Sequence, residues 1–366
     1  VLKSDFLTQG PKVKVFEEAL VKYTGAKYAV ACANGTAALH LAYLAAGLKA
    51  GDEVITTPNT FAATANMLMA IGAKPIFCDI RIDTYNIDEN KIEKLINNLP
   101  AGGQEKLKAI VPVHFAGQSC EMKKIKKIAK KFQLLIIEDA CHALGGKYGG
   151  DKIGSCKYSD MAVFSFHPVK SITTGEGGAI TTNNKKFYEK MISLRSHGIH
   201  KDRNGKNVMD ELGFNYRITD IQCALGLSQL KKLDKFIKKR REVIKWYEEE
   251  LDGVKEIILP SELPGNYSVW HLYIIRTKKR SDRDKFKKYL YKNGIGVNFH
   301  YPAVYSHPYY RKNGYKNIKL KNMEEYQNTC ITIPCHTQLT KKDIKYIGNV
   351  IKKIFCKIIY VGKNNL

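Results

Sequence analysis

The segment from Tyr28 to Leu48 reads YAVACANGTAALHLAYLAAGL, and its two halves differ in character. The first half, Tyr28–Ala33, is a short apolar run bounded by Asn34-Gly35, which is typical of a buried strand. The second half, Thr36–Leu48, has the length and composition of a helix. The segment therefore predicts a strand that leads directly into a helix, the unit from which parallel sheets are built.

The same alternation continues to about Thr182. Further strands are predicted at Glu53–Thr57, Pro75–Cys78, Ala109–Val113, Leu134–Glu138, Met161–Phe164 and Gly178–Thr181. Further helices are predicted at Phe61–Ile71, Asp88–Asn98 and Glu121–Phe132. This order predicts an α/β fold with a mostly parallel sheet and helices on both faces. In such sheets, ligands bind on the loops that follow the carboxyl ends of the strands.

The pattern changes toward the C-terminus. A long helix is predicted from Thr219 to about Leu251. It is followed by short strands at Ile257–Leu259, Trp270–Arg276 and Gly296–Tyr301, and by helices at Ser281–Asn293 and Lys341–Lys353. We therefore expect a large domain over residues 1–250 and a smaller α+β domain over residues 251–366.

The composition is that of a globular protein. Of the 366 residues, 44% are hydrophobic and 26% are charged, which excludes a mostly disordered chain. No apolar run is long enough for a transmembrane helix, so we expect no membrane partner. The nine cysteines are scattered and form no CxxC pair, which favours reduced thiols and a cytoplasmic location, and indicates no metal site.

The chain carries a formal net charge of +25, which raises the question of a nucleic-acid partner. The lysines, however, fill the polar sides of amphipathic segments such as Met122–Phe132 and Lys231–Arg241. No nucleic-acid-binding motif accompanies them. We therefore expect solvated helix faces and no nucleic-acid partner, in a positive field that would still attract a phosphorylated substrate.

Two of the predicted carboxyl-end loops carry groups that suit a charged ligand. Asn34-Gly35-Thr36-Ala37 opens a helix, and its backbone N–H groups would form either a phosphate site or a plain helix start. Asp139 ends a buried strand, where a carboxylate serves as a metal ligand, a cap or the counter-ion of a cofactor cation.

A third loop, after the strand Met161–Phe164, contains a lysine in an apolar, glycine-flanked turn. It reads SFHPVKSITTGEGGA from Ser165 to Ala179, with Lys170 in its middle. A desolvated lysine loses its proton readily and can form a Schiff base with a carbonyl. An anion cradle, a strand-end acid and a turn with Ser165 and Lys170, in this order, are the parts that pyridoxal phosphate needs.

In these three loops the sequence resembles the sugar aminotransferases of the DegT/DnrJ/EryC1/StrS family, which are fold-type-I pyridoxal-phosphate enzymes. The matching blocks occur in the family's order along nearly the whole chain. They are Leu7–Pro11, Asn34–Ala38, Thr60–Asn66, Glu138–Ala140, the Lys170 turn, Gly213–Asp220, Gly294–Val297 and His300-Tyr301. The resemblance implies a large cofactor-binding domain, a smaller C-terminal domain and pyridoxal 5'-phosphate as the cofactor.

The resemblance also implies a role for each matching residue. Lys170 would bind the cofactor covalently and move protons, and Asp139 would pair with the pyridinium nitrogen. Phe61 would stack on the cofactor ring and His142, where many relatives carry Gln, would lie beside it. The phosphate would be held by Gly35, Thr36, Ala37 and Ser165, and by Asn215 of a second subunit, so the active unit would be a homodimer.

Within the family, the Lys170 turn and the segments Leu194–Ile199 and Ile221–Leu230 are similar to one subgroup, the UDP-4-amino-4,6-dideoxy-N-acetyl-β-L-altrosamine transaminases of pseudaminic acid biosynthesis. The implied reaction moves an amino group from L-glutamate to C4 of UDP-2-acetamido-2,6-dideoxy-β-L-arabino-hexos-4-ulose, a UDP-4-keto-6-deoxy amino sugar. Substrate contacts are implied for Thr8, Thr36, Asn298, Phe299, His300, Tyr301 and Tyr310. The last two are equally compatible with packing roles.

Two other interpretations stay open at this point. The same chemistry could act on another UDP- or dTDP-linked keto-6-deoxy sugar, because Asn298-Phe299 and the following Pro302 depart from the family's usual pattern near the substrate. A non-catalytic basic binding protein on the same fold is disfavoured, because Lys170, Asp139 and Ser165 are all present. The family's dehydratase-like members carry histidine in place of the lysine, so Lys170 favours transamination.

Overall fold

The computed structural model describes the backbone of residues 1–363 and the side chains of residues 1–355. Its centre is a seven-stranded sheet in the order β1-β9-β8-β5-β4-β2-β3. The strands are β1 (Tyr28–Cys32), β2 (Glu53–Thr56), β3 (Lys74–Phe77), β4 (Leu107–Val111), β5 (Leu135–Asp139), β8 (Met161–Ser165) and β9 (Gly178–Thr182). Within this sheet, β9 alone runs antiparallel to its neighbours, so the predicted mostly parallel sheet is confirmed.

Helices cover both faces of the sheet, because successive strand side chains point to opposite sides. They are α1 (Pro11–Thr24), α2 (Gly35–Ala45), α3 (Ala63–Ala70), α4 (Glu89–Asn97), α6 (Met122–Lys131), α7 (Lys185–Arg195), α8 (Asp220–Leu230) and α9 (Leu233–Leu251). On β8, Met161 and Val163 share a core with α2, α3 and α7. Ala162 and Phe164 face the other way, into a core with α1 and the start of α9. The predicted helices on both faces are confirmed.

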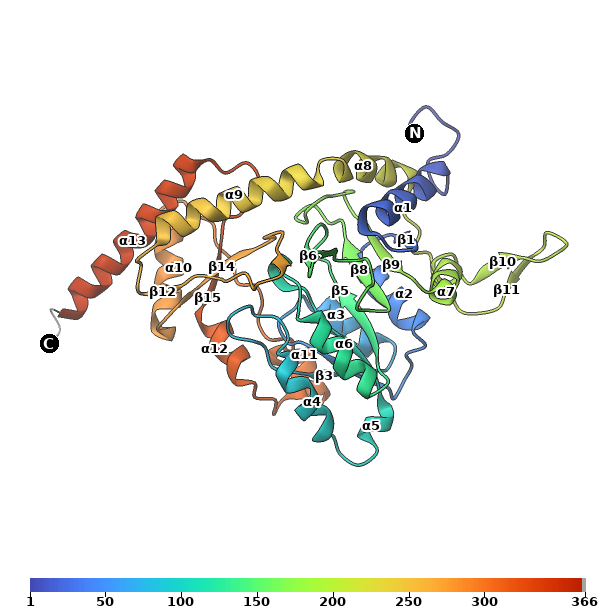
Figure 1. Cartoon of the computed structure of the whole chain (residues 1–366), viewed down its shortest axis with the longest axis horizontal. Coiled ribbons are helices and arrows are strands. Elements are labelled where there is room, and N and C mark those ends of the chain that lie inside the picture. Colours follow the sequence, from blue (N-terminus) through green and yellow to red (C-terminus); the bar gives the residue numbers. More distant parts are fainter. Residues whose placement is uncertain (364–366) are drawn as a thin grey trace.

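The C-terminal part has its own antiparallel sheet in the order β12-β14-β15. Its elements are β12 (Ile257–Ile258), β14 (Tyr273–Thr277), α10 (Arg283–Lys292), α12 (Lys321–Thr329), β15 (Cys330–Ile333) and α13 (Lys341–Lys363). Figure 1 shows α9 running from the large sheet to this part of the molecule. Along α9, Leu233 packs under the large sheet and Tyr247 packs in the C-terminal core. The expected boundary after residue 250 falls at the end of this helix and stays a prediction.

Two predicted elements differ from the structure. The single helix expected from Thr219 to Leu251 is two helices, α8 and α9, which meet at Lys231 and Lys232. Neither residue is a glycine or a proline, so the break carries no local stop signal. The strand expected over Gly296–Tyr301 is wrong, since only Asn298 pairs there, with Thr332. The residues after Asn298 instead turn toward the large sheet.

Smaller elements lie at the periphery. The three-stranded sheet β13-β6-β7 (Asn266–Tyr267, Lys147–Tyr148 and Asp151–Lys152) joins the two parts of the molecule. The hairpin of β10 (Ile199–Lys201) and β11 (Asn207–Met209) projects from the body next to α7 (Figure 1). Across the described residues, no helix is both long and apolar enough to cross a membrane.

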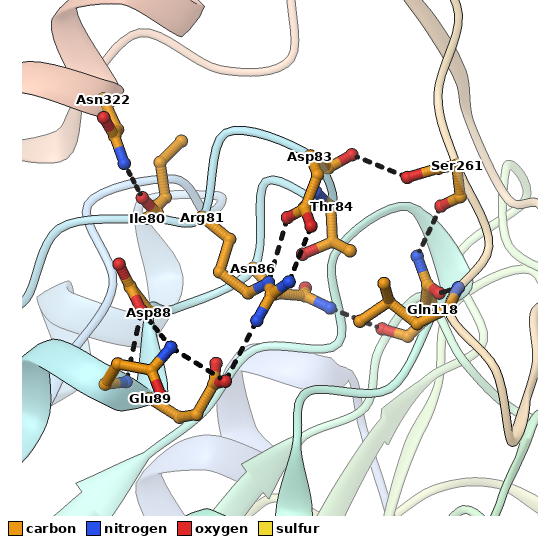
Figure 2. Close-up of polar contacts among 12 residues, drawn as sticks. Ile80, Arg81, Asp83, Thr84, Asn86, Asp88, Glu89, Gln118, Ser261 and Asn322 are labelled. Atoms are coloured by element: carbon orange, nitrogen blue, oxygen red, sulfur yellow. Dashed lines mark hydrogen bonds and ion pairs between the residues drawn. The ribbon is translucent and has the colours of Figure 1, made fainter.

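The loop between β3 and α4 fastens the large sheet to the C-terminal part (Figure 2). Arg81 donates to Asp83 at 2.9 and 2.6 Å and to Glu89 at 3.0 Å, which holds the loop in shape. From the C-terminal part, the Ser261 hydroxyl donates to the carbonyl of Asp83 at 3.3 Å, and the Asn322 amide donates to the carbonyl of Ile80 at 2.7 Å. The two parts are therefore joined by polar contacts as well as by α9.

Candidate active site

Most of the predicted site residues meet in one cavity of about 1030 Å³, which we call the main cavity. It lies at the carboxyl edge of the large sheet, where β1, β2, β5 and β8 all end. The predicted cofactor residues that line it are Gly35, Thr36, Ala37, Phe61, Asp139, His142, Ser165 and Lys170. The predicted substrate residues that line it are Thr36, Asn298, Phe299, His300 and Tyr301.

Asp139 is the last residue of β5 and is only 5% exposed. Its carboxylate accepts a hydrogen bond from the Thr64 hydroxyl at 2.7 Å and one from the backbone N–H of Cys141 at 3.2 Å. Thr64 in turn lies 2.7 Å from the hydroxyl of Thr60. A buried carboxylate needs such donors, and they fix its orientation toward the cavity.

Lys170 lies in the turn after β8 and lines the main cavity together with Asp139. Burial lowers the pKa of its amine, because the charged form is poorly solvated there, although Cys141 and Asp139 oppose the shift. The turn is held by the bond from the backbone N–H of Lys170 to the carbonyl of His167 at 2.9 Å. Burial thus shifts Lys170 toward the neutral amine, which is the form that attacks a carbonyl or accepts a proton.

The start of α2 and the end of β8 form a cradle for an anion. The Asn34 side chain caps α2 by accepting from the N–H of Ala37, which leaves the first N–H groups of the helix for a ligand. A Cβ on Gly35 would lie 2.9 Å from the Cβ of Ser165, so only glycine permits this close approach. The Ser165 oxygen accepts weakly from the N–H of His167 at 3.4 Å, and its proton is available for donation.

Aromatic and imidazole side chains form the opposite wall. The Phe61 ring is 62% exposed and meets Tyr301 edge-on, with ring centroids 6.1 Å apart. The Tyr301 hydroxyl lies 3.5 Å from His142 Nε2, and His142 Nδ1 has no hydrogen-bond partner among the described residues. Burial, with smaller effects of Lys170 and His300, lowers the pKa of His142. This wall therefore presents a neutral imidazole beside an exposed aromatic face.

Three predicted residues lie outside the main cavity. Thr8 is exposed and pairs through its backbone with Thr219. Asn215 is exposed, pairs with Ser196 and does not line the main cavity of its own chain. Tyr310 is 2% exposed and packs beside Phe77, and its hydroxyl donates to Asn66 at 2.7 Å. This placement favours a packing role for Tyr310.

The structure adds residues that sequence reasoning did not single out. Thr64, the hydrogen-bond donor to Asp139, stands in a family block but carries no signal of its own, because its partner is 75 residues away. His271 packs against His142 with ring centroids 4.4 Å apart. Burial is the main cause that lowers the pKa of His271, and its Nδ1 has no partner among the described residues. A lone histidine next to a tryptophan gives no sequence signal for this position.

The residues of the main cavity fit pyridoxal phosphate. The glycine-lined cradle suits its phosphate, and Asp139 and Lys170 suit its ring nitrogen and its aldehyde. No group of His, Cys, Asp and Glu suited to a metal ion occurs among the described residues. Fold and cavity together define the class of the fold-type-I pyridoxal-phosphate enzymes.

The chain belongs to the DegT/DnrJ/EryC1/StrS aminotransferase family, whose model matches residues 1–352. It is 42% identical over 360 residues to the UDP-4-amino-4,6-dideoxy-N-acetyl-beta-L-altrosamine transaminase of Campylobacter jejuni serotype O:23/36, covering 98% of this chain and 93% of that one. It is therefore an aminotransferase, and its cofactor is pyridoxal phosphate, as the resemblance implied.

Solved structures agree with this assignment. The fold matches PseC of Helicobacter pylori, an aminotransferase involved in the biosynthesis of pseudoaminic acid, with a TM-score of 0.91, 36% identity and coverage of 98% of this chain and 94% of that one. It also matches the PLP-form of the putative sugar aminotransferase Spr1654 of Streptococcus pneumoniae, with a TM-score of 0.89, 29% identity and coverage of 98% and 94%.

Proposed function

We propose that this enzyme moves the amino group of L-glutamate to C4 of UDP-2-acetamido-2,6-dideoxy-β-L-arabino-hexos-4-ulose, a step that serves pseudaminic acid biosynthesis. The observation that carries the chemistry is the shared cavity of Lys170 and Asp139, with the anion cradle of α2 beside them. The choice of sugar is supported by the names of the relatives in Campylobacter and Helicobacter, which match nearly the whole chain.

In this proposal each residue of the cavity has a defined task. Bound pyridoxal phosphate supplies an aldehyde and an electron-withdrawing ring. Asp139, oriented by Thr64, keeps the proton on the ring nitrogen. The Nζ of Lys170, whose pKa is lowered by burial, would accept the proton from the α-carbon of glutamate and later deliver one to C4 of the sugar. Phe61 covers one face of the ring, and Ser165 with the start of α2 holds the phosphate.

The wall of Asn298, Phe299, His300 and Tyr301 would contact the nucleotide sugar, since these residues line the main cavity opposite the cradle. Arg283 and Lys287 lie over the ring of Phe299, at 4.5 and 4.6 Å from its centroid. They bring positive charge to this side of the site, which suits a diphosphate.

A second copy of the chain completes the site in this proposal. Asn215 is exposed and lies outside its own main cavity, so it is free to reach the phosphate of a partner's cofactor. We also place the enzyme in the cytoplasm, because all eight cysteines whose side chains are described are free thiols; Cys356 lies outside these side chains.

The test is product analysis on a pair of substrates. The purified holoenzyme is given L-glutamate and either the proposed β-L-arabino 4-keto sugar or its D-configured isomer, UDP-4-keto-6-deoxy-GlcNAc, and the products are identified by NMR. We expect the 4-amino product from the first substrate at a kcat/KM at least about tenfold higher, a free-energy difference of about 1.4 kcal/mol. A preference for the D-configured sugar would overturn the substrate but keep the chemistry.

Lys170→Ala provides the control on the chemistry. We expect its turnover to fall by about 10⁴-fold or more, because both the covalent link and the proton carrier are lost. Borohydride reduction followed by peptide mass spectrometry should place the cofactor on Lys170 in the wild type and nowhere in the variant. Normal turnover in the variant would refute the assignment of Lys170.

A further inference from the structure

A second cavity, of about 560 Å³, adjoins the main cavity on the other side of the Lys170 turn. We call it the side cavity. It shares Lys170, Asn298, His300 and Tyr301 with the main cavity, so a molecule bound there lies directly beside the reactive lysine. Its far wall is formed by Arg240 of α9 and by the segment around His336. The tasks proposed above for the cofactor and the sugar do not use this space.

The side cavity is lined by positive and neutral polar groups. Arg240 contributes positive charge, and Lys170, three histidines and several hydroxyl and amide side chains complete the lining. No aspartate or glutamate is among its described lining residues. A cavity with a cationic side chain and no carboxylate in its lining attracts an anion.

Arg240 is a buried cation of the side cavity, and it has no counter-ion among the described residues. It is only 8% exposed, and no acidic side chain within the described residues forms an ion pair with it. Its Nη1 donates to the carbonyls of Trp270, His271 and Cys335 at 3.1, 3.3 and 2.7 Å. Its Nε and Nη2 donate to no group in the described part of the chain. A buried guanidinium without a counter-ion is costly, and this one is held rigidly with part of its fork free.

His271 lies next to Arg240 in the lining of the side cavity. Its side chain is 6% exposed and lines the side cavity, and its Nδ1 has no partner among the described residues. Arg240 and His271 are coupled, since Arg240 holds the carbonyl of His271 in place.

We propose that the side cavity is the binding site for the amino donor, and that Arg240 binds a carboxylate of that donor. This inference rests on the proposed function, which requires glutamate to bring its amino group to the cofactor beside Lys170. Both donor and keto product carry two carboxylates, and Arg240 offers a preoriented fork to one of them. The side cavity therefore gives the enzyme its preference for a dicarboxylic amino donor, while the main cavity holds the cofactor and the nucleotide sugar.

The first test measures binding of glutarate, an unreactive dicarboxylate, to the holoenzyme by isothermal titration calorimetry. We expect Arg240→Gln to raise the Kd for glutarate at least about tenfold, because the charge-assisted hydrogen bonds are lost. The glutamate concentration that half-saturates conversion of the cofactor, followed by absorbance with no sugar present, should rise by a similar factor. Lys239→Gln, an equal charge change at a residue of α9 that does not line the side cavity, should change neither value.

A second pair of variants leaves the carbonyl contacts of Arg240 intact. Gln229 also lines the side cavity and is half-buried. Gln229→Glu places a competing carboxylate there and should weaken glutarate binding about tenfold, whereas Gln229→Lys should not weaken it. This pair decides the question if Arg240→Gln fails to fold. Wild-type glutarate binding in both Arg240→Gln and Gln229→Glu would overturn the proposal.

The outcomes separate this inference from the proposed function. A wild-type enzyme that binds glutarate and converts its cofactor with glutamate, yet does not aminate the proposed sugar, would keep the donor site and reject the substrate. A wild-type enzyme that aminates the sugar with glutamate but shows no effect of Arg240→Gln or Gln229→Glu would keep the function and reject the donor site.

Discussion

Gly35 has no Cβ, which allows the start of α2 to lie close to Ser165. This close approach sets the size of the anion cradle. In Gly35→Ala the new Cβ would lie 2.9 Å from the Cβ of Ser165, which is closer than real contacts allow. We expect the cradle to widen and the Kd for pyridoxal phosphate to rise about tenfold, equivalent to about 1.4 kcal/mol. A fluorescence titration of the apoprotein with the cofactor measures this change. Gly296→Ala, at a glycine with open space around it, should bind the cofactor normally, and equal affinities for both variants would contradict the prediction.

The buried histidines of the site predict that acid destabilises the protein. Burial, with a smaller effect of Lys170, lowers the pKa of His300 to about 4, and His142 and His271 are lowered as well. Histidines in the unfolded chain titrate near a pKa of about 6.5. As the pH falls below that value, the unfolded state binds protons that the folded state does not, so the free energy of unfolding decreases. The decrease attributable to His300 levels off below about pH 4.

Urea denaturation at a series of pH values checks this prediction. Between about pH 6.5 and about pH 4, His300→Gln should show a weaker pH dependence than the wild type, because one of the groups that must remain neutral is gone. His200→Gln, at an exposed histidine of the β10–β11 hairpin, should keep the wild-type dependence. If the free energy of unfolding depends on pH identically in the wild type and in His300→Gln, His300 does not contribute to the acid destabilisation.

At the scale of elements, the conformation of the loop between β3 and α4 depends on a buried carboxylate. Glu89 has a side chain that is 1% exposed, and it pairs with Arg81 at 3.0 Å and with Lys124 at 2.9 Å. Arg81→Leu removes one of these partners and also releases Asp83 (Figure 2). We expect the free energy of unfolding to fall by about 2 kcal/mol, because the buried carboxylate of Glu89 keeps Lys124 but loses one of its two cationic partners.

A double variant makes this prediction sharper. Arg81→Leu combined with Glu89→Leu removes the buried charge itself, so part of the lost stability should return. Lys14→Leu, which breaks an exposed pair with Glu18, should change stability by less than about 1 kcal/mol. If the double variant is less stable than Arg81→Leu alone, the buried charge is not the cause of the loss.

The elements also show where local sequence suffices and where it does not. The strands of the large sheet and helices such as α4 and α6 carry clear apolar patterns, and each lies close to its predicted range. The break between α8 and α9 has no such signal. The N-terminus of α8 is fixed by a capping box of Thr219 and Gln222, and Asp220 accepts from the N–H of Val13, 207 residues away. The orientation of α8 therefore depends on a contact between residues far apart in the sequence, which a local sequence pattern cannot reveal.

At the scale of the whole molecule, the proposed dimer predicts complementation between two inactive variants. Lys170→Ala and Asn215→Asp homodimers should each have little activity, the first for lack of the amine and the second because a carboxylate repels the partner's phosphate. Unfolding and refolding the two together should restore about a quarter of the wild-type activity, since half of the mixed population is heterodimers with one intact site each. No recovery, with heterodimers present by native mass spectrometry, would place Asn215 in the site of its own chain or outside the site altogether.

The sequence by itself determined the fold class and the cofactor, and it predicted the residues that bind this cofactor. Strand-and-helix alternation requires a parallel sheet, and Asp139, Ser165 and Lys170 follow strands whose carboxyl ends must meet at one edge. These conclusions depend on order along the chain, which a sequence displays directly. The same order left two roles open for Tyr310, and its place in the core beside Phe77 favours packing.

Only the tertiary structure decided what surrounds those residues. Thr64 reaches Asp139 across 75 residues, and Arg240 reaches Trp270 and Cys335 from a helix whose sequence shows only a charged, amphipathic pattern. Whether an arginine lies in solvent or is buried beside a cavity without a counter-ion is a property of packing between distant segments. The physical reason is that burial removes water from a charge, and no local pattern records which charges the folded chain encloses.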